Sequence, residues 1–315
     1  VAELVELPEF ADVTADLDAL PPPVAAGPAE RPDPVPLSPA QLSMWFSSKV
    51  ASTATAYTIT AGLLVEGPLD VDAVGAAVND VIARHESLRT VYPTLNGEPV
   101  QVVLDAAPVS VDLITPSDFD LEPSAPAVQA ALDEVAGRRF DLATEAPVRA
   151  VVVRLSEHVH VIGVAVHHIA ADGESVAPLT TDLILAYEAR RTGVAPVWPT
   201  EPVQYIDHAL ALTLSVGSAD HTRAVEFWRS ALDGAPPVHP VPLDSPRPDR
   251  PTGRADVVDA VVSPQVRDRV LAYAAAHRGT EFMVVHAALA AVLAAHTPGI
   301  DPLLGTADVV VGTPY

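Results

Sequence analysis

Residues 164–175 read VAVHHIAADGES and gather the side chains best suited to chemistry. His167 and His168 follow a run of small apolar residues, and Asp172 and Gly173 come a few positions later. Imidazole can accept and return a proton near neutral pH, and a nearby carboxylate can fix the turn behind it. Side chains alternate along a strand, so two adjacent histidines cannot both reach one ligand. One of them should support the fold while the other is exposed at the strand end.

Three interpretations of the histidine pair are open from the residues alone. Both can be polar residues that end a strand and bond nearby carbonyls. They can join His158 and His160 in a metal site, although a metal needs convergent ligands and one of each neighbouring pair faces away. Alternatively, His168 can act as a general base or positioning group, with Asp172 fixing the turn. No serine elbow, phosphate loop or dinucleotide-binding motif competes elsewhere in the sequence.

Hydrophobic periodicity places the pair at the end of a long apolar strand, among further strands and helices. We predict strands at residues 57–67, 88–94, 99–104, 109–114, 147–155, 158–168, 255–262 and 307–312. We predict helices at residues 38–46, 69–86, 125–140, 176–191, 205–212, 224–232, 264–277 and 281–296. Such alternation indicates an α/β or α+β fold in two lobes.

Two predicted helices have a defined start or apolar face. The first begins after Ser38, a good N-cap residue, and carries Leu42, Trp45 and Phe46 on one face. The second has a stripe of branched aliphatic residues at helical spacing, namely Val74, Val78, Val81 and Ile82. We expect these faces to be buried.

Proline marks the expected boundaries. Residues 1–20 can form a short amphipathic helix and a turn, and residues 21–36 are a proline-rich linker that cannot continue a helix. Three prolines cluster in residues 193–202, so the first lobe should span residues 37–192 and the second residues 193–315.

Composition excludes several classes of protein. The chain has 315 residues, 49% hydrophobic and 19% charged, which is typical of a globular protein. A formal net charge of -23 argues against nucleic acid or an anionic membrane as partner. The absence of cysteine excludes disulfides and thiolate metal sites. Neither a secretion signal nor an apolar run of about 18 residues is present, so we expect a cytoplasmic protein without a membrane span.

The segment HHIAADG fits the pattern HHxxxDG and resembles the signature of nonribosomal peptide synthetase condensation domains. Five further segments resemble motifs of that family in the same order. They are LSPAQLSMWF at residues 37–46, RHESLRTVY at 84–92, PVQYIDHAL at 202–210, EFWRSALDGAP at 226–236 and DVVVGTPY at 308–315. Ser43, Glu174 and His208 depart from the family pattern, which puts details of the substrate channel in doubt.

The resemblance implies a chloramphenicol acetyltransferase-like fold, a two-lobed, V-shaped pseudo-dimer. It implies amide-bond formation between a donor acyl or peptidyl thioester and the amine of an acceptor aminoacyl thioester. Both substrates would arrive on phosphopantetheine arms of carrier domains, next to an adenylation domain, in a monomeric multidomain synthetase. The catalytic set would be His168, His167, Asp172 and Gly173, with no metal or cofactor bound by the domain. Gly173 would allow the turn and keep the tunnel open.

Other consequences of the resemblance are expectations about subtype and extent. The sequence of residues 57–90 most resembles that of domains that join an L-configured donor to an L-acceptor. A catalytically silent docking platform and an epimerisation domain are the alternatives, and the intact HHxxxDG argues against the first. Residues 1–20 would be the tail of a preceding carrier domain.

The resemblance also implies that the second lobe is incomplete at Tyr315. The arginine that would pair with Asp172 lies beyond that residue in the family, with Arg89 or Arg84 as substitutes. The chain expressed alone should therefore be poorly soluble and inactive, with residues 307–312 left as an exposed apolar edge.

Overall fold

The computed structural model describes most of residues 31–297. The described residues are 31–49, 56–116, 122, 126–235, 242–246, 249, 258 and 260–297. The chain divides into two compact units, one of Pro23–Val216 and the other of Val1–Pro22 with Gly217–Tyr315. The expected carrier tail and most of the expected linker lie outside the described residues.

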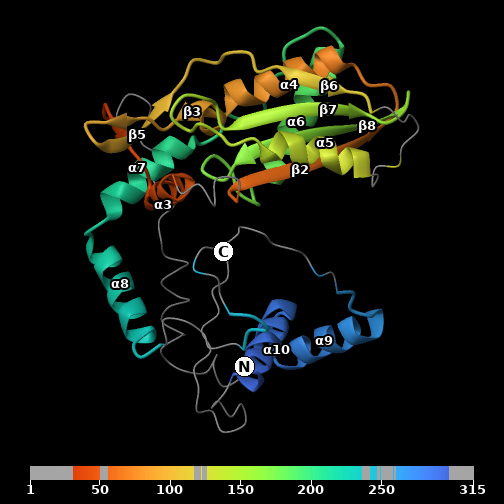
Figure 1. Ribbon diagram of the computed structural model, residues 1–315. Coiled ribbons are helices and arrows are strands. Elements are labelled where there is room, and N and C mark those ends of the chain that lie inside the picture. The colour runs from red at the N-terminus through yellow and green to blue at the C-terminus, as the bar shows by residue number, and fades with distance from the viewer. Residues whose placement is uncertain are drawn as a thin grey trace. The chain divides into compact units, whose positions relative to one another are not determined.

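A four-stranded mixed sheet forms the centre of the unit Pro23–Val216 (Figure 1). Its order is β2 (Thr58–Glu66), β8 (Val159–His167), β7 (Val148–Arg154) and β6 (Val111–Ile114). Strand β8 runs antiparallel to both β2 and β7, and β6 pairs in parallel with β7. Strand β8 has a neighbouring strand on each side, and helices cover both faces of the sheet. Nearly all of its residues are therefore buried.

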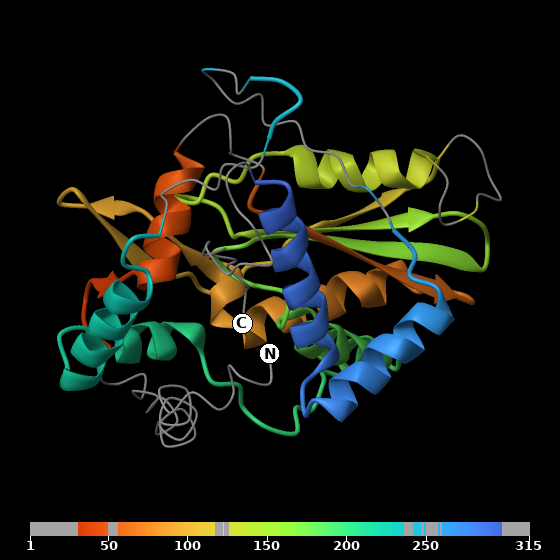
Figure 2. The same cartoon turned by 90° about the horizontal axis from the view of Figure 1, so that it is seen from below.

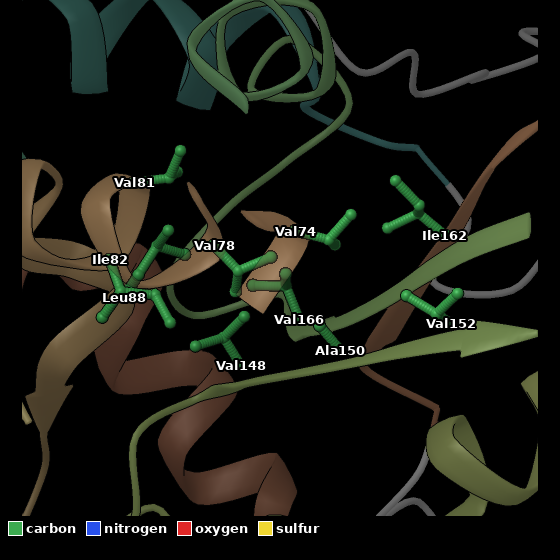
Figure 3. Close-up of a cluster of buried hydrophobic side chains, with 10 residues drawn as sticks. All are labelled: Val74, Val78, Val81, Ile82, Leu88, Val148, Ala150, Val152, Ile162 and Val166. Atoms are coloured by element: carbon green, nitrogen blue, oxygen red, sulfur yellow. The ribbon is translucent and has the colours of Figure 1, made fainter. Parts of the chain in front are cut away.

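Helices cover both faces of this sheet, with α5 (Pro126–Gly137) on one side and α4 (Val71–Arg84) on the other (Figure 2). Helix α6 (Val176–Arg191) packs beside α4. The predicted aliphatic stripe of α4 is buried against β7 and β8, as Figure 3 shows. The cluster consists of Val74, Val78, Val81, Ile82, Leu88, Val148, Ala150, Val152, Ile162 and Val166. The predicted α/β class is confirmed.

Glycine lets α5 approach the opposite face closely. A Cβ atom added at Gly163 of β8 would overlap Leu132 Cδ2 of α5 and lie 3.0 Å from Val151 Cγ1. A Cβ atom at Gly62 of β2 would lie 3.4 Å from Val161 Cγ1. The two glycines are directly opposite in the β2–β8 pair. Because neither has a side chain, they leave space on this face of the sheet for the side chain of Leu132.

A second, smaller sheet contains β1 (Val35–Pro36), β5 (Glu98–Val103), β3 (Thr90–Val91) and β4 (Thr94–Leu95), in which β1, β3 and β4 each pair with β5. The strand predicted at residues 88–94 is shorter than expected, because η3 (Glu86–Arg89) forms a 3-10 turn first.

Helix α3 (Pro39–Ser48) begins as predicted, with a capping box in which Ser38 Oγ accepts from the Gln41 main-chain N–H at 3.2 Å. Its expected apolar face is only partly buried. Trp45 is enclosed, whereas Phe46 is 58% exposed.

The first unit extends at both ends beyond the expected lobe. Arg31 donates to both carboxylate oxygens of Asp207, at 2.7 and 2.9 Å, and to Glu86 at 2.7 Å. Asp207 belongs to α7 (Tyr205–Ser215), which packs on β1 and η3. The compact unit therefore ends at Val216 rather than at the expected residue 192, because α7 packs on β1 of the smaller sheet. The last two residues of the expected linker form β1, which pairs with β5, so they also belong to the first unit.

The second unit contributes three described helices, α8 (Ala219–Ala231), α9 (Pro264–Ala276) and α10 (Glu281–Ala295), each near its predicted position. The strand expected at residues 255–262 falls partly outside the described residues, and its described residues are not in a strand. The strand expected at residues 307–312 is wholly outside them. Among the described helices, none is by itself long and apolar enough to cross a membrane; α9 and α10 pass that test only as a pair bent by 105°.

Candidate active site

The loop after β8 holds the residues predicted to do chemistry. Main-chain hydrogen bonds fix the start of the loop at the end of β8. His167 N donates to Pro147 O at 2.9 Å, and His168 N donates to Tyr57 O at 2.7 Å. The chain then turns, with Ala170 N donating to His167 O. Helix α6 begins at Val176, so the loop joins the central strand to that helix.

His167 is built into the protein interior. Its side chain is 1% exposed, stacks on Tyr57 with ring centroids 6.4 Å apart and meets Phe140 edge-on at 6.1 Å. Burial, and secondarily the neighbouring His168, lowers the pKa of His167 to about 4. The ring is therefore neutral at pH 7.

The hydrogen bond of His167 fixes its tautomer. Nδ1 accepts from the main-chain N–H of Ile169 at 3.1 Å, so the proton is on Nε2, which is buried without a partner. His167 thus holds the turn from inside, and the prediction that it faces the packed lobe is confirmed.

His168 points the other way and is only half-buried. Its Nδ1 is enclosed and has no hydrogen-bond partner. Because Nδ1 is closed to a substrate, Nε2 is the ring nitrogen left to meet one. The two histidines diverge as strand alternation predicts.

Among the described residues, Asp172 is held by Ser175 and by no arginine. Its Oδ1 accepts from Ser175 Oγ at 2.6 Å and from Ser175 N at 3.0 Å, while Ser175 Oγ accepts from Asp172 N at 3.0 Å. These bonds, chiefly the one from the Ser175 hydroxyl, lower the pKa of Asp172. Nothing in the sequence interpretation singled out Ser175, although an Asp followed three residues later by Ser is a common local turn.

The two arginines considered as partners of Asp172, should the chain be active alone, are engaged elsewhere. Arg84 pairs with Asp182 of α6 at 2.9 Å and donates to Thr200 O at 2.6 Å. Arg89 donates to the carbonyl of Leu104. Arg84 ends α4 and Arg89 ends η3, and their acceptors are Asp182 of α6 and the carbonyl of Leu104 just after β5.

Gly173 does not have the backbone conformation expected of it. Its φ is not positive, and a Cβ atom added there would meet no other atom within 4 Å. The turn itself therefore does not need glycine, contrary to the prediction. The space next to this residue is open, as the other role expected of it, keeping the tunnel open, requires.

Tyr92 contacts the loop after β8 but was not among the residues predicted to do chemistry. Its hydroxyl lies 3.4 Å from both Ile169 O in the loop and Gln41 Nε2 of α3, and Trp45 Nε1 donates to Tyr92 O at 3.1 Å. Burial raises the pKa of the Tyr92 phenol, so the hydroxyl stays protonated. The signal was present in the sequence, because these residues belong to the segments 37–46 and 84–92 that accompany HHxxxDG.

Metal ligation receives no support from the arrangement of side chains. His160 lies buried within β8, and desolvation lowers its pKa. Across the described ranges, no group of three or more His, Asp or Glu side chains is placed to hold a metal ion.

The sheet, the covering helices and the HHxxxDG loop together define an acyltransferase-like architecture, similar to that of chloramphenicol acetyltransferase. The chain belongs to the condensation domain family, whose sequence model, described as "Condensation domain", matches residues 32–315.

Two curated relatives are nonribosomal peptide synthetases or similar synthases. The isonitrile lipopeptide synthase of Mycobacterium tuberculosis is 40% identical over 91% of this chain, and the dimodular nonribosomal peptide synthase of Bacillus subtilis is 34% identical over 99%. The aligned parts make up 11% and 13% of those relatives, so the chain matches one segment of each.

Solved structures show the same fold. The X-domain from teicoplanin biosynthesis superposes with a TM-score of 0.77 and 32% identity, over 88% of this chain and 60% of that one. The first condensation domain of the calcium-dependent antibiotic synthetase has a TM-score of 0.67 and 24% identity, over 82% and 61% of the two chains. The expected family and its acetyltransferase-like fold are confirmed.

Proposed function

We propose that this domain forms an amide bond between a donor acyl or peptidyl thioester and the amine of an acceptor aminoacyl thioester. The observation that carries the proposal is the position of His168. It is half-buried at the end of the central strand, with Nε2 accessible and its main chain tied to Tyr57. An imidazole fixed in this way can meet an amine that attacks a carbonyl.

The reaction does not need a strong base. An α-amino group titrates near ~8, so about a tenth is free amine at neutral pH. A thioester is already activated toward attack, whereas bringing two reactants together in the right orientation can supply roughly 7 kcal/mol or more. His168 Nε2 accepts the proton of the attacking amine as the C–N bond and the tetrahedral intermediate form. The C–S bond then breaks, and His168 returns this proton to sulfur, so the donor arm leaves as a free thiol.

The other residues act by positioning His168. Asp172 and Ser175 close the loop behind it, and His167 holds the turn through Ile169 N. Both substrates arrive on phosphopantetheine arms of carrier domains, upstream and downstream, in a monomeric arrangement beside an adenylation domain. The multidomain relatives support this setting, since each is far longer than the matched segment.

A second candidate function has one specific observation in its favour. A structural neighbour at 32% identity is an X-domain whose structure is a complex with OxyB, so this fold can serve as a protein platform. A chain of this kind would bind carriers or tailoring enzymes without making a bond. An epimerisation domain is the third possibility, and it would exchange the α-proton of a carrier-bound residue.

Reconstitution separates the three. The protein that contains this sequence is mixed with one carrier loaded with a donor acyl group and another loaded with an aminoacyl group, and the products are measured by mass spectrometry. We expect the donor to appear as an amide on the acceptor carrier. An acceptor whose amine is acetylated is the matched control and should give none.

Two results would overturn the proposal. Carrier binding without any amide would favour the platform. Uptake of deuterium from heavy water at the α-carbon, with no condensation, would favour the epimerase.

A further inference from the structure

Arg149 of β7 lies on the same face of the central sheet as His167, one strand away. Its Cα is paired with that of Ala165, which precedes His167 by two residues in β8. Paired residues share a face, and side chains two apart in a strand share one as well, so Arg149 and His167 point to the same side. This is the face that α5 covers. The reaction proposed above gives this arginine no role.

The Arg149 guanidinium holds the chain around Phe140. Its Nη1 and Nη2 donate to the main-chain carbonyls of Arg138 and Arg139, which directly precede Phe140, the second at 3.0 Å. Nη2 also donates to Glu145 Oε1 at 2.7 Å. The guanidinium carbon lies 3.8 Å from the centroid of the Phe140 ring. An arginine that lies over an aromatic face and binds the adjacent carbonyls fixes both the position and the orientation of that ring.

Phe140 in turn packs with residues on either side of His168. Its ring meets that of His167 edge-on, with centroids 6.1 Å apart. It also belongs to the same buried cluster as Ile169, which follows His168 directly. Phe140 and Ile169 are 3% and 4% exposed, so a shift of the phenyl ring has to displace its neighbours. His168 is therefore held between two residues whose packing includes Phe140.

We propose that Arg149 is a positioning residue for His168 and acts through Phe140 and His167. The inference rests on the proposed function for the reaction and adds a residue to its machinery. The guanidinium orients Phe140, the phenyl ring and His167 hold the turn, and the turn sets where His168 Nε2 lies. A displacement of about 1 Å at a reacting group can slow a reaction about a hundredfold, so a small loosening of this packing affects the rate.

The first test compares two arginines of β7. Arg149→Met removes the charge and the hydrogen bonds but retains an unbranched chain. Arg154→Met is the matched control, because the Arg154 side chain makes no hydrogen bond or ion pair within the part of the chain that the structure describes. Both are assayed with loaded carriers at a temperature at which thermal unfolding shows each variant to be folded.

We expect Arg149→Met to lower kcat about tenfold or more, while the KM for each carrier stays within about twofold. A displaced His168 weakens the transition state more than it weakens carrier binding, whereas a general loss of folded protein would not produce this split. Arg154→Met should have the kcat of the wild type. A wild-type kcat in Arg149→Met would overturn the proposal.

A double-mutant cycle tests the path through Phe140. Phe140→Leu removes the ring under the guanidinium but keeps an apolar side chain. If Arg149 acts through this ring, the variant with both changes should have nearly the kcat of Phe140→Leu alone. Two losses that multiply would show that Arg149 acts by another route, and would contradict the proposal.

Hydrogen exchange examines the loop without any reaction. The main-chain N–H of Ile169 donates to His167 Nδ1, so its exchange rate reports how often the turn opens. Arg149→Met should raise this rate about tenfold or more, and Arg154→Met should leave it unchanged. An unchanged rate in Arg149→Met would overturn the proposal.

Arg149→Lys covers the case in which Arg149→Met does not fold. An ammonium can lie over the Phe140 ring, but it lacks the planar fork that binds two carbonyls and Glu145 together. Its kcat and its Ile169 exchange rate should therefore lie between those of the wild type and those of Phe140→Leu. Wild-type values of both would contradict the proposal.

The outcome is distinguishable from that of the proposed function. A wild type that forms amides, with a kcat and a loop exchange that do not respond to Arg149→Met, retains the function and loses this inference. A wild type that forms no amide, but whose Ile169 exchange rises in Arg149→Met and not in Arg154→Met, retains the positioning of the loop and loses the function.

Discussion

Oδ1 of Asp172 accepts two hydrogen bonds from Ser175, one from the hydroxyl at 2.6 Å and one from the main-chain N–H at 3.0 Å. The Ser175 hydroxyl oxygen in turn accepts from Asp172 N, so the two residues close a ring around the turn into α6. The loop that carries His168 is thereby shaped by its own residues. Through this ring, a change at Asp172 should alter stability and activity together.

The first prediction concerns this ring. Asp172→Asn removes the charge that the Ser175 hydroxyl stabilises, and Ser175→Ala removes the two hydrogen bonds of that hydroxyl while the main-chain bond to Asp172 remains. Each should lower the free energy of unfolding by about 1 kcal/mol and reduce amide formation. Thermal unfolding and turnover are measured on both variants and on the double variant, whose loss should be smaller than the sum. Lost turnover at unchanged stability in Asp172→Asn would indicate direct chemistry by the carboxylate.

The second prediction isolates His168. His168→Ala should reduce amide formation by a hundredfold or more, because the proton acceptor is lost. Stability should change by less than about 0.5 kcal/mol, since the His168 side chain is half-buried and has no hydrogen-bond partner at Nδ1. His158→Ala, at an exposed position near the start of β8, is the control and should behave as the wild type. Near-native turnover in His168→Ala would refute the catalytic assignment.

The third prediction concerns pH and His167. Its pKa in the folded protein, about 4, lies below the ordinary value of 6.5, so the unfolded state binds more protons between these two pH values. Stability should therefore fall as the pH drops from 6.5 toward 4, with His167 contributing on the order of 2 kcal/mol. Chemical unfolding at several pH values measures this slope.

His167→Asn is the informative variant for that slope. Its side-chain oxygen can still accept from Ile169 N, whereas it does not titrate. The variant should lose part of the pH dependence, with a remainder from His160, whose pKa burial also lowers. An unaltered slope in His167→Asn would mean that His167 is not the group that titrates.

The fourth prediction tests the close packing of α5 on the sheet. Gly163→Ala places a methyl group against Leu132, and the misfit should lower stability by about 1–3 kcal/mol. Leu132→Ala in the same chain removes the colliding atoms, so the double variant should lose less than the two single losses combined. Gly173→Ala is the matched control, because its methyl group meets no atom within 4 Å. Strictly additive losses would show that Gly163 and Leu132 do not press on each other.

The sequence by itself determined most of the local structure of the first unit and the identity of the reactive segment. Helix α6 has the predicted bounds, and the valines of α4 are buried, because hydrophobic periodicity reflects which face meets a core. Strand alternation sufficed to place the side chains of His167 and His168 on opposite faces, since that rule needs only the backbone. The six collinear segments gave the family, which the match over residues 32–315 confirms.

Only the tertiary structure decided which groups form hydrogen bonds and ion pairs with the residues of the site. Arg84 and Arg89 were plausible partners of Asp172 by charge, but the packing of α4 directs them to Asp182 and Leu104. The placement of α7 within the first unit likewise depends on an ion pair between Arg31 and Asp207, 176 residues apart. Charge and spacing specify what a residue can bind. Which partner it meets depends on contacts between distant segments, and these form only when the chain has folded.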